Sequence, residues 1–420
     1  MAQTAMVNSG VLYTDRRDFY LNPKQTAELW PSVTPFLTLS SKMKVMQSPD
    51  PDYRMFQHAA SWMNAYCLHN NGSPTALAAE GSANTYTFDG PTGMYPTVGD
   101  VYDVWTSDRA TYNGQCVVTA VSRTSATEGT FTATTTKLSN ATTTNNGFFF
   151  LIGSAVEEGT GSPAAWSEEL AMVYNSAQIF KTPLEITGTL LANAKLRGAS
   201  SELARLRMQK SKEHEMKKEL ALLLGRKDGG ITAVGTHRTG TTNQIRTTHG
   251  LIPTITDYDA GNGTNVHSFS KASLKYAQFV ELMKSAYKYG NDNATKVAIC
   301  GDDFLAWVAS FATTTGMEKN LNLTMAQDSK SFGWQFRSLQ HQFGKLDLVR
   351  SPLLTNHANG LYSGYCLIID PENVSMVRYR PDQFQAAIQA PDIDGIKDQY
   401  FSDCGLGVTL PQTHHILIAK

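Results

Sequence analysis

The stretch from residue 195 to 227 constrains the fold of this chain more than any other. It is rich in strong helix formers and contains no proline. Ser200 or Ser201 can act as the N-cap, and Gly225 stands near the point where such a helix would end. Residues 200–225 are therefore predicted to form one long helix.

This helix is apolar at both ends and polar in the middle. Every residue from Gln209 to Glu215 is polar. The apolar contacts come from Leu203, Leu206, Met216, Leu220, Leu223 and Leu224. An ordinary core helix keeps an apolar stripe along its whole length. We therefore expect this helix to cross an exposed surface, anchored at both ends, with Glu213 and Lys217 as a supporting i,i+4 pair.

The same stretch is the basic part of the chain. Residues 195–227 contain ten Lys or Arg and four Glu, a net charge of +6. A solvated basic face is the ordinary interpretation. The functional one is non-specific contact with nucleic-acid phosphates, through Arg205, Lys212 and Lys217. Both interpretations stay open at this point.

A Thr-, Gly- and Asn-rich segment precedes the helix. Strand-forming runs occur in it at Val101–Trp105, Gln115–Val121 and Thr130–Thr136. They predict a small β-barrel or sandwich at about residues 82–165. Three basic residues against seven acidic ones make it unlikely to face DNA.

Aromatic residues in and near this segment are candidate inter-subunit contacts: Trp62, Phe148, Phe149 and Phe150. Burial inside their own subunit explains them equally well.

Shorter elements follow on both sides. A short helix is expected within Pro23–Leu39, broken by Pro31 and Pro35, and residues 229–268 are expected to be loop. Further helices are predicted at 274–287 and 304–311, and strands at 53–62, 296–300, 334–336, 345–349 and 360–370. The last fifty residues read as largely β, in the runs VSMVRYR, QAAIQA, VTL and HHILIA. The fold class is therefore expected to be α+β.

No motif in the chain points to catalysis, a cofactor or a metal. The pair Asp302 and Asp303 resembles polymerase metal ligands, but its place between a strand and a helix predicts capping. His414 and His415 are neighbours on a strand and point to opposite faces, so they are expected to be ordinary strand residues. Ser41 and Lys44 match a nucleophile pattern by spacing alone. We expect no enzyme activity and no cofactor.

Composition limits where the chain acts. A net charge of -1 gives no global attraction to nucleic acid or membrane, and no run of about 18 apolar residues could span a bilayer. The N-terminus lacks an apolar signal core, which predicts use in the cytoplasm. Five scattered cysteines predict reduced thiols. Charged residues make up only 17%, below the roughly 25% typical of soluble domains, which suggests much protein–protein surface.

From Thr34 to His415 the order of these elements resembles the major capsid proteins of tailed bacteriophages. These proteins have the Hong Kong 97-type fold, and the likeness is to the subgroup with a β-insert in the extended loop. The matching segments are PFLTLSSKMKV, DPDYRMFQHAASW, NSAQIFKTPLEITGTLLA before the long helix, FGWQFRSL, FGKLDLVRSPLL, SGYCLIIDPENVSMVRYRP and LGVTLPQTHHILI.

The resemblance implies a domain plan. Residues 1–41 would be an N-terminal arm, and 42–189 an extended loop that carries the insertion and overlaps a neighbouring subunit. Residues 190–270 would form the peripheral domain with its spine helix. Residues 271–369 would form the axial domain, and 370–420 strands that return to the peripheral domain.

The resemblance also implies a function: self-assembly into hexamers and pentamers of an icosahedral head that encloses double-stranded DNA. The expected partners are a separate scaffolding protein, a portal and a possible decoration protein, with no membrane. The protein would be assembled in the host cytoplasm and reside in the virion capsid. Two alternatives stay open: a glycan- or receptor-binding module at residues 82–165, and a hydrolase, for which no residue can be nominated.

Overall fold

The computed structural model describes residues 34–42, 44–58, 67–70, 76–89, 96–125, 128–140, 147–162, 170–189, 202–231, 237–239, 243–261, 263–271, 276–289, 295–311, 326–331, 334–341 and 343–420. The chain divides into two compact units, one of residues Met1–Phe56 with Met172–Lys420 and one of residues Gln57–Ala171. Across these ranges, no helix combines the length and apolarity needed to cross a membrane.

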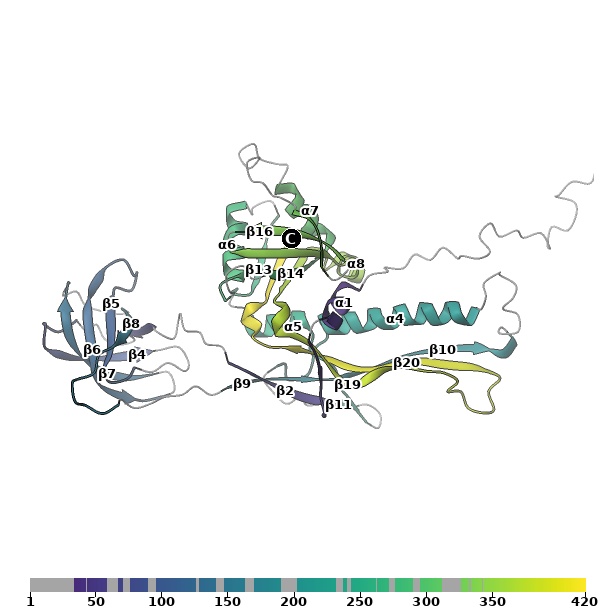
Figure 1. Ribbon diagram of the computed structural model, residues 1–420, viewed down its shortest axis with the longest axis horizontal. Helices are drawn as coiled ribbons and strands as arrows, with labels where there is room; N and C mark the ends of the chain where they lie inside the picture. The colour runs from purple at the N-terminus through teal and green to yellow at the C-terminus, as the bar shows by residue number, and fades with distance from the viewer. Residues whose placement is uncertain are drawn as a thin grey trace, which may run out of the picture. The chain divides into compact units, whose positions relative to one another are not determined.

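The unit formed by Gln57–Ala171 contains a closed six-stranded barrel (Figure 1). Its strands follow one another around the barrel in the order β3-β4-β7-β6-β5-β8. They are β3 (Cys67–Asn70), β4 (Ala83–Asp89), β5 (Asp100–Trp105), β6 (Tyr112–Arg123), β7 (Glu128–Leu138) and β8 (Phe148–Ser154). Closure leaves no unpaired strand edge.

Strict alternation along these strands separates the barrel's core from its surface. On β4, Tyr86 and Phe88 are buried while Thr85 and Thr87 are exposed. Half of the buried side chains of the barrel core are aromatic, and the rings of Phe131 and Phe149 meet edge to face, with centroids 5.2 Å apart. The threonines that dominate the composition of this segment therefore lie mainly on the outside.

The larger unit contains a four-stranded sheet in the order β1-β19-β20-β10. These strands are β1 (Lys44–Gln47), β10 (Gln178–Thr187), β19 (Val374–Gln385) and β20 (Gly395–Val408). The long helix α4 (Glu202–Leu224) runs along β10 and β20 (Figure 1). Helix α1 (Pro35–Lys42) packs on α4 and β1. Two further pairs, β2 (Asp52–Gln57) with β9 (Ala171–Ser176) and β11 (Arg238–Thr239) with β12 (Gln244–Ile245), form short ladders.

A seven-stranded mixed sheet completes this unit, in the order β13-β21-β18-β14-β17-β16-β15. Its strands are β13 (Val266–Phe269), β14 (Thr295–Cys300), β15 (Ala326–Ser331), β16 (Trp334–His341), β17 (Gly344–Arg350), β18 (Tyr365–Ile369) and β21 (His415–Ala419). The accompanying helices are α5 (Leu251–Asp259), α6 (Tyr276–Ala286), α7 (Asp302–Phe311) and α8 (Pro352–Asn356). Short 3-10 turns lie at His357–Gly360, Pro371–Asn373 and Pro411–Thr413.

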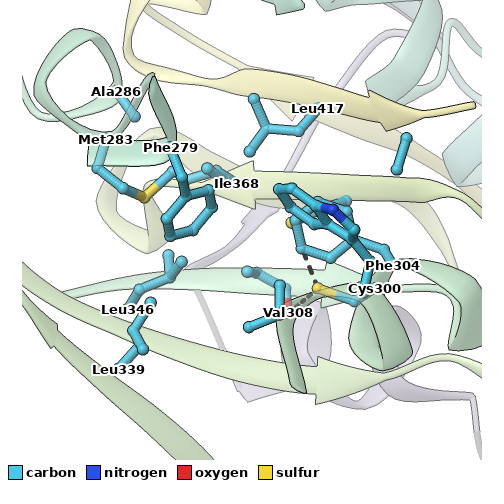
Figure 2. Packing of buried hydrophobic residues seen from close by; sticks show 14 of the residues in the cluster. Phe279, Met283, Ala286, Cys300, Phe304, Val308, Leu339, Leu346, Ile368 and Leu417 are labelled. Atoms are coloured by element: carbon cyan, nitrogen blue, oxygen red, sulfur yellow. Dashed lines mark hydrogen bonds between the residues drawn. The ribbon is translucent and has the colours of Figure 1, made fainter. Parts of the chain in front are cut away.

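Apolar side chains cover both faces of the seven-stranded sheet. On one face, Phe279 of α6 and Phe304 of α7 pack against Cys300, Ile368 and Leu417 (Figure 2). On the other face, the strand residues next in sequence to Cys300, Ile368 and Leu417 belong to a second apolar cluster. This cluster also includes Leu222 and Leu223 of α4. Because neighbouring residues of a strand point to opposite faces, β14, β18 and β21 serve both clusters. The C-terminal half of α4 is thus anchored to this sheet as well as to the four-stranded one.

Several sequence expectations were wrong, each for a physical reason. Pro35 begins α1 instead of breaking a helix, because the first turn needs no amide donor. Likewise α5 forms where loop was expected, with Pro253 in its first turn. The run QAAIQA was expected to be a strand, but β19 ends at Gln385, the first residue of that run.

The capping role predicted for Asp302 or Asp303 is also wrong. Helix α7 begins at Asp302, so both carboxylates lie in its first turn, where the helix dipole favours negative charge. Asp302 forms a two-point ion pair with Arg350, with Nε–Oδ1 and Nη2–Oδ2 distances of 2.6 Å each. The carboxylate of Asp303 lies 3.7 Å from Nζ of Lys271, so each member of the acidic pair has a basic partner.

Replacing Phe149 by alanine tests the barrel core. Phe149 is fully buried, whereas Phe150 next to it is half-buried. We expect Phe149→Ala to lower the barrel's stability by about 3–5 kcal/mol, the usual range for removing a buried phenylalanine. Phe150→Ala should lower it far less. Hydrogen exchange of the barrel amides in the full chain measures both, and equal losses would contradict the core assignment.

Candidate functional site

The middle of α4 contacts the four-stranded sheet through polar side chains, a surface we call the polar interface. Its members are Arg207, His214 and Lys218 on the helix, and Thr182, Asp382, Asp398 and Ser402 on the strands. The first of these contacts is an ion pair. Nε and Nη2 of Arg207 each lie 2.8 Å from Oδ2 of Asp398, whose carboxylate is almost fully buried. The other oxygen of Asp398 accepts the backbone N–H of Ala387 at 2.9 Å.

His214 occupies the centre of the polar interface. Its Nδ1 lies 3.0 Å from the Thr182 hydroxyl and its Nε2 lies 2.7 Å from the Ser402 hydroxyl. Burial, with the nearby charge of Lys218, lowers the pKa of His214 to about 4. The ring is therefore neutral near pH 7, with one nitrogen donating and the other accepting.

Two further charged groups of α4 point into the protein. The Nζ of Lys218, a buried side chain, lies 3.0 Å from Oδ2 of Asp382. Glu219 is fully buried and accepts the backbone N–H of Leu37, in the first turn of α1, at 3.4 Å. Burial raises the pKa of Glu219 to about 8. Glu219 thus attaches α1 to the long helix.

The polar middle of the helix, expected to cross an exposed surface, is exposed only in part. Glu215 is exposed and residues 209–213 are half-buried, whereas His214 is buried against hydroxyls of the strands beneath. On either side of this stretch, Arg207 and Lys218 pair with carboxylates of the sheet. The sequence does contain an indication of these polar partners, because Asp398, Ser402 and Asp403 interrupt an otherwise strand-like run. Sequence spacing alone could not show which helix they would meet.

The three candidate DNA-facing residues lie on α4 at different angles. Arg205 and Lys212 are seven residues apart, two turns of helix, so they share a face. Lys217 lies five residues further on, roughly 140° around the helix axis. Its Nζ is 2.6 Å from Glu213, which also pairs with Lys210, and these hydrogen bonds lower the pKa of Glu213. Lys217 is half exposed, whereas Arg205 and Lys212 are each partly buried.

The aromatic contact candidates differ in exposure. Phe149 is fully buried in the barrel core, so it has no surface to offer a neighbour. Phe148 and Phe150 are half-buried and stack with ring centroids 6.1 Å apart, and the guanidinium of Arg109 lies 4.3 Å from the Phe148 ring. Trp62 lies outside the described residues.

Neither a metal centre nor a catalytic group emerges in the part of the chain that the structure describes. No three or more His, Cys, Asp or Glu side chains of these ranges are arranged to hold a metal ion. Among the cysteines, Cys116, Cys300, Cys366 and Cys404 are free and buried.

A comparison with protein families decides between the possible roles. Residues 106–419 match the family model described as SU10 major capsid protein. The chain belongs to the SU10 major capsid protein family. The match begins directly after β5 and covers the whole of α4, the seven-stranded sheet and the strands β10, β19 and β20 of the four-stranded sheet. A structural capsid family is generally non-enzymatic.

Individual relatives are more distant. The chain is 24% identical over 245 residues to a major capsid protein of Pseudomonas phage PaMx41. That match covers 58% of this chain and 54% of the relative, so the chain spans about half the length of the curated relative it matches.

Solved structures with some likeness are also distant. One is the capsid of a native GTA particle, at 8% identity and TM-score 0.47, covering 100% of this chain and 99% of the other. Another comes from Mycobacterium phage Bobi, at 10% identity and TM-score 0.46, covering 99% of each chain. At these TM-scores they carry no weight beside the family match.

Replacing Asp398 by asparagine tests the polar interface. The change keeps the side chain's shape but removes the charge that pairs with Arg207. We expect Asp398→Asn to lower the free energy of unfolding by roughly 1.5–3 kcal/mol, which is typical for hydrogen bonds to charged groups. Lys217→Gln is the matched control, because its exposed pair with Glu213 should contribute only about 0.3–0.5 kcal/mol. Hydrogen exchange of the slowest-exchanging β20 amides measures the stability change caused by each substitution. Equal effects of the two substitutions would refute a role of the polar interface in holding α4 on the sheet.

Proposed function

We propose that this chain is the shell-forming subunit of a tailed-phage head, with the Hong Kong 97-type fold and a β-insert in its extended loop. Copies would assemble into hexamers and pentamers around double-stranded DNA. The observation that carries this proposal is the family match over residues 106–419. The arrangement of one long helix on a sheet that includes the C-terminal strands β19 and β20 is consistent with it.

The elements suggest how the proposed domains would divide. The peripheral domain would be α4 with the four-stranded sheet, and the axial domain would be the seven-stranded sheet with α6 and α7. The extended loop would be residues 42–189, with the barrel as its insertion. The separation of Gln57–Ala171 as a compact unit supports an insertion whose bounds are wider than 82–165.

Exposed apolar side chains support extensive contact with neighbouring copies. The two-stranded ladder of β2 and β9 leaves Phe56 63% and Met172 44% exposed. A two-stranded ribbon is marginally stable by itself. We propose that a neighbouring subunit covers this ribbon in the shell and that Phe148 and Phe150 take part in further contacts.

The other proposed partners follow from the same role. Packaged DNA would be contacted non-specifically by Arg205, Lys212 and Lys217. Because Arg207 and Lys218 already pair with buried carboxylates of the sheet, fewer basic groups are free for phosphates than the net charge of +6 over residues 195–227 suggests. A separate scaffolding protein, a portal and a possible decoration protein would complete the head, assembled in the host cytoplasm.

Electron microscopy of the purified protein, alone and co-expressed with a scaffolding protein, tests the shell role. We expect closed shells, or rings of five or six subunits. A monomer under every condition would contradict the proposal. A glycan- or receptor-binding role for the barrel would then be tested by measuring binding of the purified monomer to immobilised glycans.

Neutralising three basic residues tests the DNA contact. The variant Arg205→Gln, Lys212→Gln, Lys217→Gln should still form shells, because none of these side chains belongs to the polar interface. Genome retention should fall and depend less steeply on salt, since each lost phosphate contact lowers that slope by about one unit. The matched control, Arg109→Gln, Arg123→Gln, Lys137→Gln, removes the same charge from the acidic barrel. Normal packaging in the α4 variant would refute the contact.

A further inference from the structure

A cluster of buried histidines surrounds the start of the C-terminal strand β21. His415, the first residue of β21, and His267 on the neighbouring strand β13 stack with centroids 6.1 Å apart and planes only 5° from parallel. His414 precedes them and is fully buried. These residues have no part in the polar interface or in the proposed DNA contact.

The ring nitrogens of this cluster are poorly satisfied. Neither Nδ1 nor Nε2 of His415 has a hydrogen-bond partner, and Nε2 of His414 and Nε2 of His267 are buried without one as well. Nδ1 of His414 accepts the backbone N–H of Asp370 at 3.1 Å, and the backbone of Thr264 hydrogen-bonds to His267. Four buried ring nitrogens without a hydrogen-bond partner still lie in one place, so charging these rings is costly while they stay buried.

The charges that face the cluster from the surrounding elements oppose protonation on balance. Lys296 of β14 is buried, with its Nζ held by the carbonyls of Ala286 and Thr413 at 2.8 Å and 2.6 Å. Asp259 at the end of α5 is a counter-charge to His267 and His415, but the backbone N–H groups of Gly263, Thr264 and Asn265 already occupy its carboxylate. Asp370, after β18, acts chiefly on Lys296.

The acid–base properties agree with this geometry. Burial and the charge of Lys296 lower the pKa of both His414 and His415 to about 3. Burial also lowers the pKa of His267, although Asp259 acts in the opposite direction. Burial lowers the pKa of Lys296 to about 8, a value that still leaves it mostly charged near pH 7.

We propose that His267, His414 and His415 form an acid-sensitive switch that holds β21 against β13 when neutral and releases this edge of the seven-stranded sheet when protonated. A second and third positive charge beside Lys296 would have no partner while the strands stay paired. Separating the strands admits water, which solvates the imidazolium rings. This inference concerns the fold of one chain and does not rest on the proposed shell function.

The direction of the pH effect follows from linkage. In the open state the histidines regain a pKa near 6.5, so the open state binds more protons than the closed one. The stability of the β13–β21 pairing is complete above about pH 6.5 and falls as the pH drops towards about 3. At pH 4.5 His414 and His415 can each favour opening by up to about 100-fold, because their open-state pKa of about 6.5 lies about two units above that pH.

Hydrogen exchange on the full chain at pH 7 and pH 4.5, corrected for intrinsic rates, tests the proposal. The reporters are the amides of Ile416 and Lys420, which donate to the carbonyls of Asn265 and Phe269 across the two strands at 2.8 Å and 2.9 Å. At pH 4.5 these amides should exchange tenfold or more faster, while the barrel strands and β14 keep their protection. If the unmodified chain lost amide protection evenly along its whole length at pH 4.5, the proposal would be overturned.

Substitutions then locate the titrating groups. His415→Phe keeps a flat ring in the buried site but cannot be protonated, so it should reduce the acid response of the Ile416 and Lys420 amides by about tenfold or more. His267→Phe, on the edge strand, makes the same test if His415→Phe does not fold. His214→Gln is the control, since it removes a buried histidine of lowered pKa elsewhere. An unchanged acid response in the phenylalanine variants would overturn the proposal.

Discussion

The rest of the larger unit depends on how α4 is held on the four-stranded sheet. Apolar packing tolerates sliding and rotation, whereas ion pairs and hydrogen bonds between buried groups fix one register. Arg207 with Asp398, His214 with Thr182 and Ser402, and Lys218 with Asp382 hold the helix at three points. Beyond them, Leu222 and Leu223 enter the core under the seven-stranded sheet, so one helix aligns two sheets.

This arrangement changes how the basic residues of α4 are interpreted. Buried ionic contacts add little net stability compared with apolar packing, but breaking one leaves an unpaired charge and is costly. Part of the basic content of α4 therefore specifies the fold, and only the remainder is available for a ligand. A subunit that must meet its copies at many contacts needs such a fixed frame, because errors in helix position would be repeated around the whole shell.

Sequence reasoning located some elements but not their pairing. The long helix, the barrel strands β5, β6 and β7, and β14 carry local signals, namely helix formers without proline and alternating or continuous apolar runs. Strands β10 and β20 contain buried polar residues such as Thr182 and Asp398, which hide the apolar pattern until the partner helix is known. For the same reason the polar middle of α4 was interpreted as exposed. The histidine cluster depends on parallel pairing of β13 with β21, a long-range contact that no local pattern encodes.

The most direct test of the whole account is a cryo-EM reconstruction of DNA-filled particles built from this chain. The account predicts a closed shell of hexamers and pentamers, with the polar interface of α4 against its own sheet and the Arg205–Lys212 face directed at the packaged genome. A reconstruction in which this face is turned to the outside of the particle, or in which the chain decorates a shell made by another protein, would contradict it.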